Sequence, residues 1–272
     1  MQPKPSDTVF SDAVSQMYER HLVPLIFEPY AAATAERLAA RPVTRVLEVA
    51  AGTGVLTRAL AARLPESASI TATDLNQAML DKAASVGTSR PVEWRQANAL
   101  DLPFDDGEFD AVVCEFGVMF FPDKPKAFAE ARRVLRADGV LLFSVWDRIE
   151  ENEFADVITN ALTSIFPDDP PQFLRRTPHG YFDQNSIARD LRRGGFSSAP
   201  TCTTIAERSR ADTATAPSIA YCQGTPLRAE IEMRGPGRLE ELTERAANAL
   251  RERFGRGPVD GKIQAHLVTV LK

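Results

Sequence analysis

An acidic residue followed by a run of very small ones is the part of this sequence best suited to hold a ligand. Glu48 is followed by Ala50, Gly52 and Gly54, giving the pattern acid-x-Ala-x-Gly-x-Gly. A short apolar stretch precedes this turn and a helix-like pattern begins at Val55, so a ligand can touch bare backbone beside the positive end of a helix. The same glycines also suit a tight turn that needs positive φ and binds nothing.

The residues around this turn discriminate between two kinds of nucleotide. A dinucleotide fold requires Gly-x-Gly-x-x-Gly, and Thr57 stands where its third glycine belongs. Glu48 would repel a diphosphate but suits a cationic amine. Asp74 ends the next predicted strand, where a carboxylate can accept both hydroxyls of a ribose or can cap a helix. These residues indicate a nucleoside joined to an amino acid.

Candidate catalytic groups are sparse. Glu115 ends the fourth predicted strand and either acts as a general base or only lines the pocket. His179 follows Pro178 in a later segment, and its alternative is a structural or solvent-exposed histidine. The apolar residues between Phe116 and Phe121 predict a substrate-side wall that is partly plain core. We expect no metal site, because the three histidines are far apart and no paired carboxylate motif occurs.

Strands alternate with helices through the first half of the chain. The predicted strands are 44–49, 69–74, 92–96, 109–114 and 140–145, and the predicted helices are 55–64, 76–84 and 123–135. This alternation predicts an α/β fold, a doubly wound, mostly parallel sheet with helices on both faces. Later segments read as helices at 151–166, 183–193, 216–234 and 239–254 and as strands at 201–207 and 264–271.

Four parts of the chain follow from this pattern. Residues 1–41 are expected to form an N-terminal helical lid, in which Pro24 and Pro29 divide the helical pattern, and residues 42–148 the ligand-binding core. Residues 149–180 are expected to be an inserted helical cap after the fifth strand. Residues 181–272 would continue the core, with a second helical insertion at about 212–258 after the sixth strand.

Composition places the chain among ordinary globular proteins. It has 272 residues, of which 44% are hydrophobic and 25% charged, and a net charge of −5. The acidic excess argues against binding nucleic acid or an anionic membrane surface. Three widely spaced cysteines predict no disulfide framework and a reducing, cytoplasmic location. No apolar run approaches the ~18 residues that insertion into a membrane requires.

Four segments together resemble the S-adenosylmethionine-dependent methyltransferases with a Rossmann-like fold. The resemblance is strongest to the bacterial small-molecule branch related to the ubiquinone and menaquinone methyltransferases. The segments are Val46–Gly54, Ala72–Leu80, Gln96–Phe104 with Phe109-Asp110, and Arg133–Gly139. Their order and spacing cover about Val43 to Trp146, and the match is far more specific than a glycine turn alone.

The resemblance implies S-adenosylmethionine as cofactor, S-adenosylhomocysteine as product, and a role for each matching position. Glu48, Ala50, Gly52 and Gly54 would surround the methionine portion and the ribose, and Asp74 would hold the ribose hydroxyls. Leu75 and Met79 would lie against the adenine, with Asn98 at its amino group and the Ala99 backbone at its ring. The Glu115 carbonyl would accept from the methionine amine.

Two positions depart from the family pattern. Ala50 replaces the usual first glycine, and Asn98 replaces the usual acid, although its amide oxygen can still accept a hydrogen bond. The resemblance implies methyl transfer to a small-molecule acceptor by in-line displacement. The alternatives are a nicotinamide-dependent, NAD(P)-binding oxidoreductase and a non-catalytic protein that binds S-adenosylmethionine. Neither the acceptor, nor the methylated atom, nor the oligomeric state follows from these residues.

Overall fold

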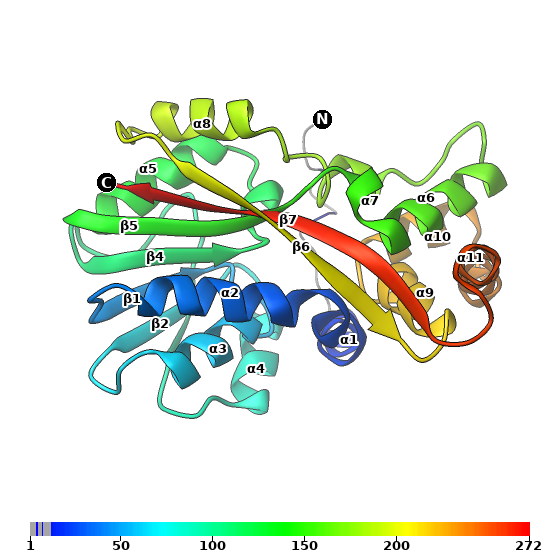
Figure 1. Ribbon diagram of the computed structural model, residues 1–272, viewed down its shortest axis with the longest axis horizontal. Coiled ribbons are helices and arrows are strands. Elements are labelled where there is room, and N and C mark those ends of the chain that lie inside the picture. Colours follow the sequence, from blue (N-terminus) through cyan, green and yellow to red (C-terminus); the bar gives the residue numbers. More distant parts are fainter. Residues whose placement is uncertain (1–3, 5–6, 8–11) are drawn as a thin grey trace.

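A seven-stranded sheet forms the centre of the protein (Figure 1). The computed structural model describes Lys4, Asp7 and residues 12–272. The strand order is β3-β2-β1-β4-β5-β7-β6. The strands are β1 (Arg45–Val49), β2 (Ser69–Asp74), β3 (Glu93–Gln96), β4 (Phe109–Glu115), β5 (Leu135–Trp146), β6 (Thr201–Ala211) and β7 (Val259–Leu271). β1 to β5 pair in parallel and β7 runs antiparallel to both β5 and β6.

Helices cover both faces of this sheet, which confirms the predicted doubly wound core. α2 (Glu28–Ala39) packs on α3 (Val55–Arg63), and α5 (Lys124–Val134) packs on α8 (Gln184–Arg193); α4 (Gln77–Val86) packs on β2 and β3. Alternate residues of a central strand enter different cores: Val112 of β4 belongs to the core that contains α5 and α8, and Val113 to the one under α2 and α3. β4 is therefore buried on both faces, as its nearly continuous apolar sequence requires.

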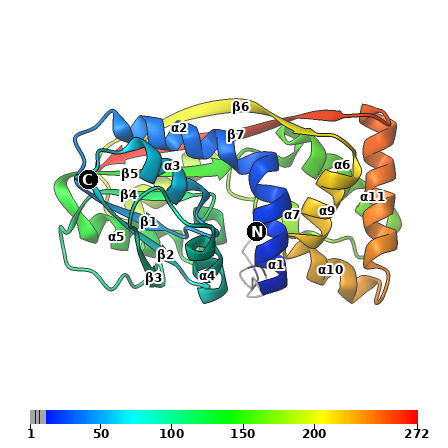
Figure 2. The ribbon, with the colours of Figure 1, turned by 90° about the horizontal axis from the view of Figure 1, so that it is seen from below.

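The N-terminal helical segment is continuous rather than divided. α1 (Asp12–Met17) leads into η2 (Tyr18–Phe27), a π-helical stretch that contains Pro24, and η2 leads into α2. Wider π-helical turns accommodate the proline without ending the helix, and Pro29 lies in the first turn of α2, where no backbone N–H is needed. Figure 2 shows α1 running at a steep angle to α2. Apart from Lys4 and Asp7, the part of the predicted lid before residue 12 lies outside the described residues.

Apart from α8, which packs on α5, the helices between the late strands gather at the end of the sheet and are here called the cap (Figures 1 and 2). α6 (Glu153–Ile165) and α7 (Phe173–Arg176) follow β5, after the short 3-10 helix η4 (Ile149–Glu151). α9 (Thr215–Gln223), α10 (Leu227–Arg234) and α11 (Leu239–Phe254) follow β6. α11 packs on α6 and α9, and α10 packs on α7 and α9, so the two segments share one interior. The predicted helix 216–234 is in fact two helices, separated at Gly224.

β6 and β7 form a long antiparallel pair, connected through α9, α10 and α11, that reaches from the sheet to the cap (Figure 1). They pair from Thr201↔Thr269 to Ala211↔Val259, whereas β7 pairs with β5 only up to Ala265. The sequence predicted both strands too short, because the outer half of β6 is rich in exposed charge. Arg208 and Arg210 donate to Asp260 on β7, with Nε–O distances of 2.6 and 3.1 Å, and these pairs hold the outer half together.

Candidate cofactor and acceptor site

The turn between β1 and α3 takes up a left-handed backbone at three positions. The φ angles are 56° at Ala50, 55° at Gly52 and 82° at Gly54. A Cβ on Gly54 would lie 3.1 Å from the Ala83 Cβ and 3.1 Å from the Trp94 ring, so both conformation and space require glycine there. Ala50 adopts this backbone despite its methyl group, at a cost of about 1 kcal/mol.

A second strained turn, after β4, lies directly against the first. Phe116 has φ of 51°, an outlier for a bulky residue, and a Cβ on Gly117 would lie only 2.5 Å from the Ala50 Cβ. The Phe116 ring stacks on Trp146, with 3.9 Å between centroids and 10° between planes. Strained backbone of this kind persists where packing fixes it, and it concentrates at functional sites.

Asp74 anchors the first turn through both carboxylate oxygens. Oδ2 accepts from the Gly52 N–H at 2.9 Å, and Oδ1 accepts from the Asn76 N–H at 2.8 Å. Asn76, not Asp74, occupies the N-cap position of α4, so the helix-cap alternative does not describe this carboxylate. Burial raises the pKa of Asp74, and the hydrogen bonds from Asn76 and Gly52 oppose that rise.

Glu48 lies beneath the turn rather than in front of it. Its side chain is 1% exposed, and its Oε2 accepts from the Thr57 hydroxyl at 2.6 Å. Burial raises the pKa of Glu48 to about 8, and the Thr57 hydrogen bond opposes that rise. Thr57 stands where a dinucleotide-binding fold has its third glycine. In this protein the Thr57 hydroxyl instead donates a hydrogen bond to the buried Glu48.

A cavity of about 170 Å³ opens at the carboxyl ends of the strands and joins the two strained turns to the cap. We call the two parts of its lining the loop end and the cap end. The loop end contains Ala50, Gly52, Asp74, Leu75, Met79, Asn98, Ala99 and Glu115. The cap end contains Trp146, Asn152, Phe173, Leu174, Pro178, His179, Tyr221, Thr225 and Pro226. The η2 helix also contributes to the lining, through Tyr18, Leu22, Ile26 and Phe27.

The cavity thus brings together most of the predicted site residues. Of those predicted to hold a cofactor, only Glu48 and Gly54 are missing from the lining. Asn98 is exposed, and its Oδ1 already accepts from the Leu100 N–H at 3.0 Å, which shapes the loop after β3. Met79 is buried, and Leu75 is 51% exposed. Phe116, Phe120 and Phe121 form the expected wall, whereas Met119 lies outside this lining, in the core.

Glu115 lines this cavity, and its carboxyl group is buried. Neither of its oxygens is accessible to solvent, and neither has a hydrogen-bond partner among the described residues. Burial, followed by the nearby charge of Glu48, raises its pKa well above the usual range. The lining contains two carboxyl side chains and no lysine or arginine, so it is electrostatically suited to a cationic ligand.

His179 faces the cap end as a neutral imidazole. Its Nδ1 lies 2.8 Å from the Asp147 carbonyl oxygen, which can only accept, so Nδ1 carries the proton and Nε2 keeps a lone pair. Burial lowers the pKa of His179 to about 4, against a smaller opposing effect of that hydrogen bond. A neutral ring with one free lone pair can accept a proton or a hydrogen bond from a ligand.

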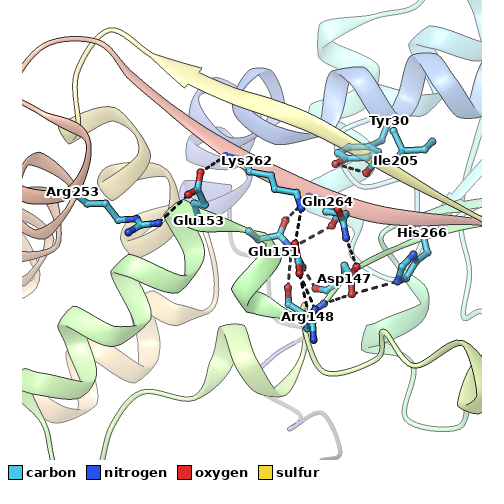
Figure 3. A network of polar contacts seen from close by, with 11 residues as sticks. Tyr30, Asp147, Arg148, Glu151, Glu153, Ile205, Arg253, Lys262, Gln264 and His266 are labelled. Atoms are coloured by element: carbon cyan, nitrogen blue, oxygen red, sulfur yellow. Dashed lines mark hydrogen bonds and ion pairs between the residues drawn. The ribbon is translucent and has the colours of Figure 1, made fainter.

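A polar network fixes the loop that orients His179 (Figure 3). Asp147 accepts from Gln264 Nε2 at 2.6 Å through its Oδ2, and its Oδ1 lies 3.4 Å from His266 Nε2. Asn152, which lines the cavity, accepts from the Gln264 N–H at 3.1 Å. Figure 3 shows Gln264 and His266 pointing towards Asp147 from β7, so this strand positions the loop that contacts His179.

A buried ion-pair network, here called the latch, joins three distant parts of the chain beside α7. Arg176 Nη2 lies 2.7 Å from Asp7 Oδ1 and 2.8 Å from Glu230 Oε1. The side chain of Arg176 is 3% exposed and that of Asp7 is 2% exposed. The latch connects the N-terminal segment, α7 and α10, and α7 also supplies Phe173 and Leu174 to the cavity lining.

Sequence reasoning missed most of the cap end. Trp146 gave a usable signal, because it directly follows an apolar strand whose carboxyl end faces the site. No sequence pattern indicates that Phe173 and Tyr221 belong to the site, because they lie in two segments that meet only when the cap packs together. Among the described residues, no cluster of three or more histidine, cysteine, aspartate or glutamate side chains is placed to hold a metal. None of the described helices is both long and apolar enough to span a bilayer.

Comparison with known proteins agrees with this geometry. A family model described as a methyltransferase domain matches residues 47–143. The ubiquinone/menaquinone biosynthesis C-methyltransferase UbiE of Shewanella pealeana is 38% identical over 176 residues, which are 60% of this chain and 70% of that protein. A malonyl-[acyl-carrier protein] O-methyltransferase of Geobacter sulfurreducens is 36% identical over 155 residues, 57% of this chain. The chain spans only 56% of that relative.

A solved structure shows the same fold. The crystal structure described as a putative methyltransferase from Bacillus halodurans has a TM-score of 0.56 at 18% identity, and the match covers 89% of this chain and 98% of that one.

Proposed function

Because the chain belongs to the S-adenosylmethionine-dependent methyltransferases of the small-molecule type, we propose that it methylates a small acceptor bound at the cap end of the cavity. The observation that carries this proposal is the continuity of the cavity. One space connects the backbone turn and Asp74, at the loop end, with the aromatic lining and His179 at the cap end. Such a shape holds a donor and an acceptor together, and orientation alone can supply about 7–11 kcal/mol of the barrier.

The loop end fits the cofactor that the family uses, S-adenosylmethionine. The turn at Ala50 and Gly52 offers backbone without bulky side chains, Asp74 stands at the end of β2 for the ribose hydroxyls, and Met79 gives an apolar surface for the adenine. The unpaired carboxyl of Glu115 suits the positive charge of this ligand. Bound S-adenosylmethionine would supply an electrophilic methyl group that needs no activation by the protein.

Glu48 and Gly54 support this end indirectly. Glu48 holds Thr57, and through it the first turn of α3, while Gly54 allows the turn to pack on Ala83 and Trp94. We therefore assign both to shaping the turn. Asn98, Ala99 and Glu115 line the same end of the cavity. We assign the Ala99 backbone and Asn98 to the adenine and the Glu115 carbonyl to the methionine amine.

The acceptor should have an apolar body and one protic group. Most of the cap end is aromatic or aliphatic, and Asn152, Thr225 and His179 are its polar members. His179 is the best-placed proton acceptor, because its Nε2 lone pair is free and its tautomer is fixed by Asp147. The N-terminal helix and the cap would act as a lid that excludes water, since η2, α7, α9 and the start of α10 supply much of the lining.

The acidic net charge and the free cysteines support a small-molecule acceptor rather than nucleic acid, and a reducing compartment such as the cytoplasm.

Calorimetry with S-adenosylhomocysteine and NAD tests the proposal. We expect micromolar binding of S-adenosylhomocysteine and none of NAD, since Thr57 and the acids around the turn disfavour a diphosphate. Tight binding of NAD with no binding of S-adenosylhomocysteine would favour the oxidoreductase alternative. Transfer of a labelled methyl group to members of a panel of apolar phenols, enols and amines then distinguishes an enzyme from a protein that only binds the cofactor.

A further inference from the structure

The carboxyl group of Glu115 lacks the partner that a buried acid needs. Its residue ends β4 and lines the cavity, and its two oxygens have neither solvent nor a hydrogen-bond donor among the described residues. Asp74, the other acid of the lining, accepts two backbone N–H groups. The two acids therefore differ: each oxygen of Asp74 already accepts a backbone hydrogen bond, and the oxygens of Glu115 accept none from the described residues.

Among the described residues that line the cavity with Glu115, none is a lysine or an arginine. Tyr18 of η2 has its pKa raised by burial and then by the charges of Glu115 and Asp74, so it remains a neutral phenol. Glu48 and Asp74 are acids, and His179 is neutral. Arg58 of α3 donates to the Thr53 carbonyl and to Glu19.

An unpaired carboxylate in such surroundings costs several kcal/mol, so the group holds a proton until a cation replaces it. The proposed function brings cations to this place. The methyl donor carries a sulfonium and an ammonium, and an amine acceptor would carry an ammonium. Each of these cations is complementary to a lining that contains two carboxyl side chains and no lysine or arginine.

We propose that Glu115 is a proton-exchanging cation site: its carboxyl releases a proton to solvent and pairs with a cationic group of the ligand that fills the cavity. The assignment rests on the proposed function, which supplies the ligand. The exchange is balanced, because the neutral acid becomes a carboxylate and one proton enters the buffer while one cation arrives. Binding is therefore favoured as pH rises, by up to about tenfold per pH unit while the free protein holds the proton.

Calorimetry in pairs of buffers with different ionisation enthalpies counts the released protons. S-adenosylmethionine, S-adenosylhomocysteine and, added to the S-adenosylhomocysteine complex, benzylamine are the three probes. We expect about one proton to be released near neutral pH. Release with S-adenosylmethionine alone identifies the sulfonium as the cation, and release with both nucleosides identifies the ammonium of the methionine portion. Release with benzylamine only assigns the site to an amine acceptor.

Two neutral variants show which acid exchanges the proton. Glu115→Gln replaces a neutral carboxyl by a group of similar shape, and we expect it to bind without releasing a proton and with no dependence on pH. Glu115→Met serves if the glutamine variant does not fold. Glu48→Gln should still release the proton, and its pH dependence should move to lower pH because the repulsion from Glu48 is gone.

The results that overturn the inference are equally distinct. Wild-type protein that binds these probes without releasing a proton has no such exchange. Equal release from the wild-type and Glu115→Gln proteins, or loss of release in Glu48→Gln instead, places the proton elsewhere. Failure to bind either nucleoside overturns the proposed function itself, which is a separate outcome.

Discussion

Asp74 is the residue on which cofactor affinity should depend most. Its carboxylate accepts from Gly52 and Asn76, and thereby fixes the turn that a ligand would touch. We expect Asp74→Ala to weaken S-adenosylhomocysteine binding by roughly ten- to hundredfold, since hydrogen bonds to a charged group contribute about 1.5–3 kcal/mol. Calorimetry measures this loss directly.

Asp110 provides a matched control for that substitution. It also accepts from backbone N–H groups, those of Thr44 and Arg45 at the opposite end of β1. Asp110→Ala should lower stability and leave the affinity for S-adenosylhomocysteine unchanged. If the two variants lost affinity equally, the ribose role of Asp74 would be refuted.

His179 gives the protein a dependence of stability on pH. Its pKa is about 4 in the folded state, below the ordinary value of 6.5, because burial disfavours the imidazolium. The unfolded chain therefore binds more protons in this window, and the free energy of unfolding falls as pH drops from 6.5 towards 4. Below the folded pKa this contribution falls no further.

The matched variant is His179→Asn, which keeps an N–H for the Asp147 carbonyl but cannot titrate. Urea denaturation at a series of pH values should show a shallower acid-side loss of stability in the variant than in the wild type. Parallel curves would mean that His179 is not buried as a neutral ring.

At the scale of elements, the contact between the two strained turns leaves no room for a side chain at Gly117. A Cβ there would lie 2.5 Å from the Ala50 Cβ and 2.7 Å from the Cys114 sulfur. We expect Gly117→Ala to destabilise the protein by about 1–3 kcal/mol, as overpacking does, and to weaken cofactor binding by moving the turn at Ala50. Denaturant midpoints and calorimetry measure the two effects.

Gly257 is the control for this substitution, because a Cβ there would meet nothing within 4 Å and its backbone is not left-handed. Gly257→Ala should change neither stability nor affinity by a measurable amount. If Gly117→Ala were equally silent, the two turns would not be in tight contact.

The sequence predicted elements well where the signal was local. β1 and β4 contain short apolar runs, and β2 alternates Ile70 and Ala72 with polar residues. The site residues from Glu48 to Gly54 and at Asp74 lie within a few residues of a strand. The positive φ of Phe116 could not be predicted, because only its stacking on Trp146 and the neighbouring turn stabilise it.

The outer halves of β6 and β7 were not predicted, for a different reason. Charged residues such as Arg208 and Arg210 are typical of loops, and only their pairing with Asp260 on β7 stabilises them in a strand. The cap end of the site was not predicted for the same reason, because Phe173 and Tyr221 come together only when two segments far apart in sequence pack on each other.

At the scale of the whole molecule, the latch joins the N-terminal segment to α7 and α10. Arg176 joins Asp7 and Glu230, and removing it leaves these two buried carboxylates without their positively charged partner. We expect Arg176→Met to lower the free energy of unfolding by about 3–5 kcal/mol, measured by urea denaturation. Arg228→Met removes an exposed pair with Glu232 and should cost less than about 1 kcal/mol. Similar costs for the two variants would contradict a buried latch.

The long antiparallel pair of β6 and β7 also determines which segments can be exchanged with a relative in a chimaeric protein. β7 is one strand with two partners, since its inner half pairs with β5 and its outer half continues with β6 towards the cap. A chimaera that takes the cap from another member must therefore also take β6 and β7, because Gln264 and His266 hold Asp147, whose carbonyl orients His179. The crossover point that preserves the site lies before Asp147, so that Asp147, α6, α7 and the β6–β7 pair come from the same protein. The acceptor preference and the pairing of β6 with β7 would then both come from the same parent protein.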